Sequence, residues 1–220
     1  MWRKRWVRIV LVLLLLLAGG VAWVIYTVKQ VRPFYTAALA IPEPKLKEAN
    51  REFLNRASRF KNDVVKPGEW QLLITDEQIN GWLAVDLKNN HPDALPAEMK
   101  DPRVDIDPTQ ISLGVMVDRD PFPVAASLDL KVLLTSSHEL AIRVIAARLG
   151  DLPWPVESIV AQLRRAAGEQ GWTVRETTID NDPVLILKPP PPEEGKAEIT
   201  LETLELREGE IYLKGKTTGR

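Results

Sequence analysis

The sequence predicts an α+β fold in which an N-terminal transmembrane helix is followed by an antiparallel sheet packed on long amphipathic helices. Residues 9–28 carry no formal charge, two later segments repeat apolar residues every three or four positions, and long stretches alternate apolar with other residues. We therefore expect three parts. Residues 1–32 form a basic start and anchor, residues 33–66 a linker and amphipathic helix, and residues 67–220 an extracytoplasmic α+β domain.

Charge is distributed unevenly along the 220 residues, whose formal net charge is −1. Residues 1–32 hold six basic side chains and no acidic one, so residues 33–220 hold the other 23 basic groups and all 30 acidic groups, a net charge of −7. A nucleic-acid binder needs a face rich in lysine and arginine, so this acidic body argues against nucleic acid as a partner. The chain has no cysteine, which excludes disulfides and thiolate catalysis.

The uncharged segment at residues 9–28 predicts one membrane span, because twenty helical residues at about 1.5 Å each cross a hydrocarbon core of roughly 30 Å. A cleavable signal peptide is the main alternative, but the segment leads into Trp23, Tyr26 and Lys29 and not into a small-residue cleavage site. Four basic residues precede or open the span and two follow it. We therefore expect a single-pass protein of the plasma (inner) membrane, with a cytoplasmic N-terminus and the bulk of the chain outside the cytoplasm.

After Pro33 and the prolines of residues 42–44, a helical period returns. The apolar positions are Leu46, Ala49, Phe53, Leu54, Ala57, Phe60 and Val64. They predict an amphipathic helix of about five turns that packs its apolar stripe on its own domain. A position on a lipid surface is the alternative, because basic residues flank the stripe.

Residues 69–74 predict a short strand, and Thr75 with Gln78 predicts a capping box that starts the next helix. This helix turns Ile79 and Trp82 inward. Asn80 lies near that face, and we expect its amide to satisfy a buried backbone group and not to act in catalysis. Residues 89–102, rich in Pro, Asp and Asn, predict a loop.

From residue 103 onward the period changes to two. Alternation over residues 111–117, 124–134 and 140–146 predicts long antiparallel strands with one apolar face; the third segment also fits a helix, but its β-branched residues favour a strand. Residues 156–167 predict a second amphipathic helix. Further strands are expected around residues 172–179, 184–187, 197–207 and 210–216, with a hairpin turn at Glu208 and Gly209 and an extended polyproline loop at residues 189–192.

The pattern Asp-x-Asp-Pro occurs three times, beginning at Asp105, Asp118 and Asp180. Paired carboxylates can bind a hard cation such as calcium, and they also suggest a two-carboxylate glycosidase. Each copy, however, stands where a strand should end, and there Asp initiates turns and Pro fixes the next residue. We therefore predict turns, with no metal site and no cofactor.

The inventory of catalytic motifs is equally sparse. His91 and His138 lie in predicted loops, and neither has a second histidine at the spacing of a helical zinc protease. The sequence contains no G-x-S-x-G elbow, P-loop or dinucleotide-binding glycine fingerprint. We therefore predict no catalytic residues and no enzymatic activity.

Three segments carry a resemblance to known proteins: TDEQINGWL at residues 75–83, GDLPWP at 150–155 and ITLETLELREGEIYLKGK at 199–216. In these segments the chain resembles the YpmS-like family of single-pass envelope proteins and, more distantly, tubular lipid-binding (TULIP-like) domains. The resemblance implies a curved antiparallel sheet wrapped around a long helix, with an apolar interior, and it carries over no catalytic residue. The chain lacks the repeated halves of a full tubular module, which argues against a closed lipid tunnel.

Two functions remain. The first is a membrane-anchored, extracytoplasmic and non-enzymatic protein of envelope structure or assembly, with the lipid bilayer and other envelope proteins as partners. The alternative is a lipid- or amphiphile-binding domain whose apolar groove holds the acyl chains of a bound lipid. That groove would be lined by Leu113, Val115, Leu128, Leu130, Val132 and Ile142. Alternation shows an apolar sheet face in both cases and does not reveal whether helices fill it.

Overall fold

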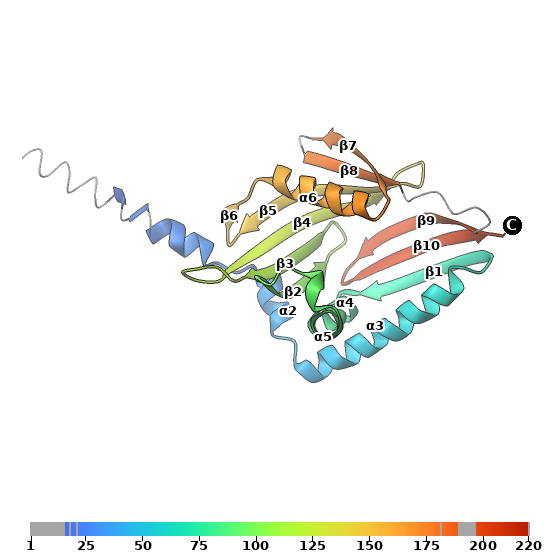
Figure 1. The fold of residues 1–220 in the computed structure, drawn as a ribbon, viewed down its shortest axis with the longest axis horizontal. Helices are drawn as coiled ribbons and strands as arrows, with labels where there is room; N and C mark the ends of the chain where they lie inside the picture. The colour runs from blue at the N-terminus through green and yellow to red at the C-terminus, as the bar shows by residue number, and fades with distance from the viewer. Residues whose placement is uncertain (1–15, 18, 21, 181, 189–196, 220) are drawn as a thin grey trace, which may run out of the picture.

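Strands dominate the structure. The computed structural model describes residues 16–219 apart from 18, 21, 181 and 189–196. Its strands form two antiparallel sheets, one of three strands and one of seven (Figure 1). The predicted polyproline loop at residues 189–192 lies outside the described residues.

The three-stranded sheet has the order β1-β10-β9 and joins strands from distant parts of the chain. Its members are β1 (Gly68–Thr75), β10 (Glu210–Thr218) and β9 (Glu198–Arg207). The seven-stranded sheet has the order β2-β3-β4-β5-β8-β7, with β6 (Leu152–Pro153) paired to β5. Its other members are β2 (Met99–Ile106), β3 (Ile111–Val117), β4 (Val124–Leu134), β5 (Leu140–Leu149), β8 (Asp182–Lys188) and β7 (Thr173–Ile179).

Few helices accompany these sheets. They are α2 (Pro33–Leu39), α3 (Glu43–Asp63), α4 (Asp76–Trp82) and α6 (Val156–Glu169). The chain after α4 continues through a π-helical turn, η1 (Leu83–Leu87), then α5 (Lys88–Asn90) and a 3₁₀ turn, η2 (Pro92–Ala94). Figure 1 shows α6 across one face of the seven-stranded sheet and α3 alongside β1.

The predicted transmembrane anchor is not supported. Residues 9–15, 18 and 21 of the proposed span lie outside the described residues. Among the described residues, no helix has both the length and the apolar character needed to cross a membrane. This finding contradicts the predicted single-pass topology and the predicted inner-membrane localisation.

The predicted fold class was also wrong, because the described chain is mostly antiparallel sheet, divided between two sheets, with few helices and none able to cross a membrane. The helix expected from residue 46 onward does form as α3, but of its predicted apolar stripe only Leu46 and Ala49 are buried. Leu54 is 41% exposed. Figure 1 shows α3 alongside β1 of the three-stranded sheet, and strands provide most of the architecture.

One face of the seven-stranded sheet is filled by α6. Its Val160 packs with Leu130 of β4, Val144 of β5 and the β8 residues Leu185 and Leu187, all of them buried. The alternation of β4 places Leu128 and Leu130 on this face, where Leu128 pairs with Leu113 of β3 and Ala147 of β5. The second predicted helix and the predicted strands of this region are confirmed.

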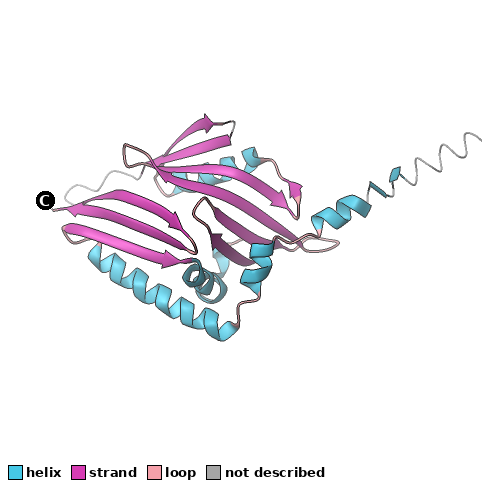
Figure 2. Ribbon diagram, turned by 180° about the vertical axis from the view of Figure 1, so that it is seen from behind, coloured by secondary structure: helices cyan, strands magenta, loops and turns pink. Residues whose placement is uncertain are grey.

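The opposite face is covered in part by α2, which Figure 2 shows from behind. Tyr35 of α2 is 1% exposed and lies on Gly114 of β3, where a Cβ atom would approach Tyr35 Cδ2 to 2.5 Å. Gly114 therefore permits the close approach of α2 to the sheet.

On the same face, the buried carboxylate of Asp129 accepts hydrogen bonds from Ser112 Oγ and Arg148 Nη1 at 2.9 and 2.6 Å.

Candidate functional site

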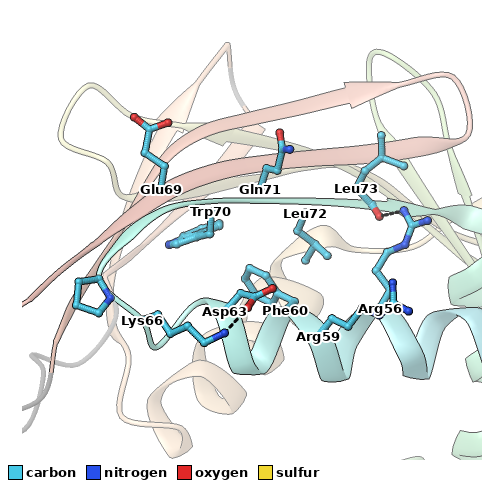
Figure 3. A pocket seen from close by; sticks show the side chains of 11 residues that line it. Arg56, Arg59, Phe60, Asp63, Lys66, Glu69, Trp70, Gln71, Leu72 and Leu73 are labelled. Carbon is cyan, nitrogen blue, oxygen red and sulfur yellow. Dashed lines mark hydrogen bonds and ion pairs between the residues drawn. The ribbon is translucent and has the colours of Figure 1, made fainter.

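A groove of about 550 Å³ lies between α3 and β1 and opens to solvent (Figure 3). Its volume falls within the roughly 300–1,000 Å³ of small-molecule sites. The α3 side contributes Arg56, Arg59, Phe60 and Asp63, and the chain then turns at Lys66 and Pro67 into β1. The site is thus built from one continuous helix-turn-strand segment.

The alternation of β1 decides which side chains enter the groove. Trp70 and Leu72 point toward α3, whereas Glu69 and Gln71 lie on the other side of the strand (Figure 3). Trp70 and Leu72 are each 8% exposed. The groove therefore has an apolar wall supplied by alternate residues of one strand.

Two neighbours hold the Trp70 indole in place. The ring of Phe60 meets it edge-on with the ring centroids 5.2 Å apart, an arrangement favoured by aromatic quadrupoles. Gly215 of β10 pairs with Trp70, and a Cβ atom there would lie 2.3 Å from Trp70 Cζ2. Only glycine leaves room for the indole at this register position.

The indole nitrogen is the unusual atom of the site. Trp70 Nε1 is buried and has no hydrogen-bond partner among the described residues. A buried donor without an acceptor costs about 1–3 kcal/mol, so a ligand that supplies an acceptor gains by that amount.

Positive charge predominates on the α3 side of the groove. The Arg56 guanidinium donates from Nη1 to the carbonyl oxygen of Leu73, while Arg59 is exposed on the next turn of the helix. Lys66 Nζ forms an ion pair with Asp63 at 2.8 Å. Glu69, which also lines the groove, pairs with Lys214 of β10 at 3.0 Å.

The six residues predicted to hold acyl chains lie elsewhere, on β3, β4 and β5 of the seven-stranded sheet. Leu128, Leu130 and Ile142 pack in the core under α6. Val115 and Val132 are half-buried, and Leu113 is 36% exposed. None of the six lines the α3–β1 groove.

The first and third Asp-x-Asp-Pro segments use their carboxylates in different ways. In the first, Asp107 Oδ1 accepts hydrogen bonds from Thr109 N and Gln110 N at 2.6 and 3.0 Å, which confirms the predicted turn. In the third, Asp180 and Asp182 both pair with Arg143, at 3.2 and 2.6 Å. Within the described ranges, no three His, Asp or Glu side chains are grouped as a metal site requires.

The two histidines also have ordinary surroundings. His138 Nδ1 lies 3.0 Å from the carbonyl oxygen of Leu201, and His91 Nε2 lies 3.4 Å from a carboxylate oxygen of Asp86. Both imidazoles are exposed. Neither histidine lines the α3–β1 groove.

Sequence reasoning missed the α3–β1 groove, although it predicted both of its walls. Arg56 and Phe60 are four residues apart on α3 and so project from one side of a helix, and Trp70 and Leu72 share one face of a strand. The missing information was that these two faces meet. Gly215 was the available signal, since a glycine in the interior of a strand often marks a close approach.

Comparison with known proteins returned no matching family model, curated protein or solved structure. The resemblance to the YpmS-like family therefore stays a prediction.

Proposed function

We propose that this protein is a non-enzymatic binding protein for a single-chain amphiphile with an anionic head group, held in the α3–β1 groove. The observation that carries the proposal is the buried Trp70 Nε1–H, which has no acceptor among the described residues and belongs to a residue that lines an open groove. The amphiphile-binding alternative is thus retained from the sequence, but at a site different from the predicted one.

The two chemical halves of the groove match the two halves of an amphiphile. Phe60, Trp70 and Leu72 offer an apolar wall to an alkyl chain, which gains about 0.8 kcal/mol for each buried methylene. Arg59 and Lys66 offer positive charge, and an arginine forms strong charge-assisted hydrogen bonds to sulfate, phosphate or carboxylate oxygens. The indole N–H supplies a further donor to the same head group.

The test compares two water-soluble probes that share a tail, octyl sulfate and octyl glucoside, by isothermal titration of the full chain below their micelle concentrations. We expect octyl sulfate to bind at least about tenfold more tightly than octyl glucoside, because one hydrogen bond to a charged group contributes about that factor in affinity. Arg59→Gln and Trp70→Phe should each weaken octyl sulfate binding several-fold. Equal affinity for the two probes, or no binding of either, would contradict the proposal.

Arg165→Gln is the matched control, because Arg165 is an exposed helical arginine of α6 that lies outside the groove. It removes the same charge as Arg59→Gln and should leave the octyl sulfate affinity unchanged. Far-UV circular dichroism of each variant verifies that the fold persists. An equal loss in both arginine variants would indicate a diffuse charge effect and would refute the site.

A further inference from the structure

A second groove, of about 380 Å³, lies between the η1 turn, the following loop and the start of β2. Its walls are mainly apolar, formed by Leu83, Ala84 and Leu87 of η1 together with Leu95 and Met99. This volume is also within the roughly 300–1,000 Å³ range of ligand sites. None of its lining residues lines the α3–β1 groove.

A buried guanidinium lines this apolar groove. Arg103 of β2 is 6% exposed, and its two hydrogen bonds to described residues go to carbonyl oxygens, from Nε to Ala38 at 3.4 Å and from Nη1 to Pro102 at 2.7 Å. No described carboxylate forms an ion pair with it. Burial lowers the pKa of Arg103, with Asp101 and Tyr35 acting in the opposite direction. A buried charge without a bonded counter-ion is an unfavourable arrangement that an anionic ligand relieves.

The backbone beside this arginine departs twice from regular structure. The β2–β3 register shifts between Lys100 and Arg103, and Asp101 within the shift has a φ of +50°. The hydroxyl of Tyr35 donates to the Asp101 carbonyl oxygen at 2.8 Å and holds the bulge. The facing wall is the π-helical turn η1. Bulges, left-handed non-glycine residues and π-helical turns recur at functional sites, where they direct side chains that regular elements cannot.

The charges around the groove favour an anion. Lys88, Lys100 and Arg103 line it, with Asp101 as the one carboxylate among its lining residues, and Lys100 is itself paired with Asp118 at 2.6 Å. This excess of positive charge stands in a body, residues 33–220, whose net charge is −7. The local potential is therefore opposite in sign to that of the body as a whole.

We propose that the groove between η1 and β2 binds an apolar monocarboxylate, with Arg103 as the counter-ion of the carboxylate and η1 as the wall for the hydrocarbon chain. The planar guanidinium matches a carboxylate and can engage both of its oxygens. The apolar walls exclude water and strengthen that pair. This site is independent of the α3–β1 groove and does not rest on the function proposed for it.

Octanoate and octanol test the site by titration of the full chain, because they share a chain and differ in charge. We expect octanoate to bind at least about tenfold more tightly than octanol. Arg103→Met should remove this preference while the fold persists, since replacement of a buried charge by an apolar side chain of similar length is often tolerated. Equal affinity for the two probes, or an Arg103→Met variant that folds and retains octanoate binding, overturns the proposal.

A second variant keeps the test decisive if Arg103→Met fails to fold. Ala84→Phe fills the groove from η1 without changing the arginine, and it should weaken octanoate binding at least about tenfold. Arg165→Met, on an exposed position of α6 outside both grooves, is the control and should leave the octanoate affinity unchanged. Arg59→Gln reports separately any octanoate that is held in the α3–β1 groove. If octanoate binding falls in Arg59→Gln but not in Ala84→Phe, the carboxylate occupies the α3–β1 groove and the present site is rejected.

Discussion

At the scale of single residues, Asn80 shows how one side chain completes a sheet. Its Nδ2 donates to the carbonyl oxygen of Val104 at 2.8 Å, and its Oδ1 accepts from the Val104 N–H, also at 2.8 Å. Val104 lies on β2, the terminal strand of the seven-stranded sheet, and is 3% exposed. The amide therefore takes the place of a neighbouring strand, which confirms the structural role predicted for Asn80.

Asn80→Ala should accordingly destabilise the protein by about 3 kcal/mol, because a buried donor and a buried acceptor would both be left unpaired. Urea denaturation followed by circular dichroism measures the change. Asn55→Ala, on an exposed position of α3, should change the free energy of unfolding by less than about 0.5 kcal/mol. Similar midpoints for the two variants would show that the Asn80 amide contributes little.

Asp105 illustrates a residue that opposes folding at neutral pH. Burial raises its pKa, and the carboxylates of Asp107 and Glu208 raise it further. The folded state consequently binds a proton more tightly than the unfolded chain does. The contribution of Asp105 to the free energy of unfolding therefore increases as the pH falls through its pKa in the folded state. At higher pH, the ionised carboxylate destabilises the fold.

Asp105→Asn should therefore stabilise the protein at pH 7, by about 0.5 kcal/mol. The gain should shrink as the pH falls through the folded pKa and vanish below the unfolded pKa, where both states carry a protonated carboxyl. Urea midpoints of the wild type and the variant, measured from pH 7 to pH 3.5, test this. A gain that is constant across this range would exclude titration of Asp105 as its cause.

At the scale of elements, the packing of α4 on α3 depends on a glycine. A Cβ atom at Gly81 would lie 2.5 Å from Asn50 N and 2.7 Å from the carbonyl oxygen of Leu46, so the two helix backbones nearly touch there. The capping box fixes the start of α4, with Gln78 N donating to Thr75 Oγ1 at 3.2 Å. Gln78 also donates from Nε2 to Glu52 of α3, at 3.2 Å, which ties the two helices together.

Gly81→Ala should destabilise the protein by about 1–3 kcal/mol, even though alanine favours a helix by nearly 1 kcal/mol, because the new methyl group meets backbone atoms that cannot yield locally. Gly168→Ala in α6 provides the opposite expectation. Nothing lies within 4 Å of a Cβ atom there, so the helix preference of alanine should raise the thermal midpoint. Stabilisation by both substitutions would mean that α3 and α4 are not held at this distance.

At the scale of the whole molecule, one turn residue joins the two sheets. Gly209, between β9 and β10, donates its N–H to the carbonyl oxygen of Ile106 on β2 at 2.9 Å, and its own carbonyl oxygen accepts from Asp76 N at 2.9 Å. Its φ is +69°, a conformation that glycine adopts without strain. The hairpin turn predicted at Glu208 and Gly209 is confirmed, and it also connects the three-stranded sheet to the seven-stranded one and to α4.

Gly209→Ala should destabilise the whole protein by roughly 1–2 kcal/mol, because a Cβ atom is strained in the left-handed region. Gly209→Asn should lower the free energy of unfolding by less than Gly209→Ala does, since asparagine tolerates the left-handed region better than alanine. Hydrogen exchange of β2 and β10 amides should accelerate together in the alanine variant. Faster exchange in β10 alone would show that the turn does not couple the sheets.

The local patterns of the sequence determined most of the strands, the α4 capping box, the β9–β10 turn and the role of Asn80, because alternation, capping and turn chemistry act over a few residues. They also suggested a transmembrane anchor and one sheet packed on long amphipathic helices. This fold class was wrong, because the described chain forms two sheets with few helices, none of them able to cross a membrane. The apolar residues of a segment do not reveal which other element packs against them. In this protein α6 packs on the sheet face that carries Leu130, whereas a groove lies between α3 and Trp70 of β1.

Only the tertiary structure decided how the strands divide between two sheets and where the grooves lie. The strand that begins at Gly68 pairs with one that begins at Glu210, and β5 pairs with β8 past the intervening α6 and β7. Such pairings depend on contacts between distant segments, which no local period encodes. The same holds for the Trp70 indole against Gly215 and for the guanidinium of Arg103 against Ala38 of α2, since each contact joins residues that are remote in sequence.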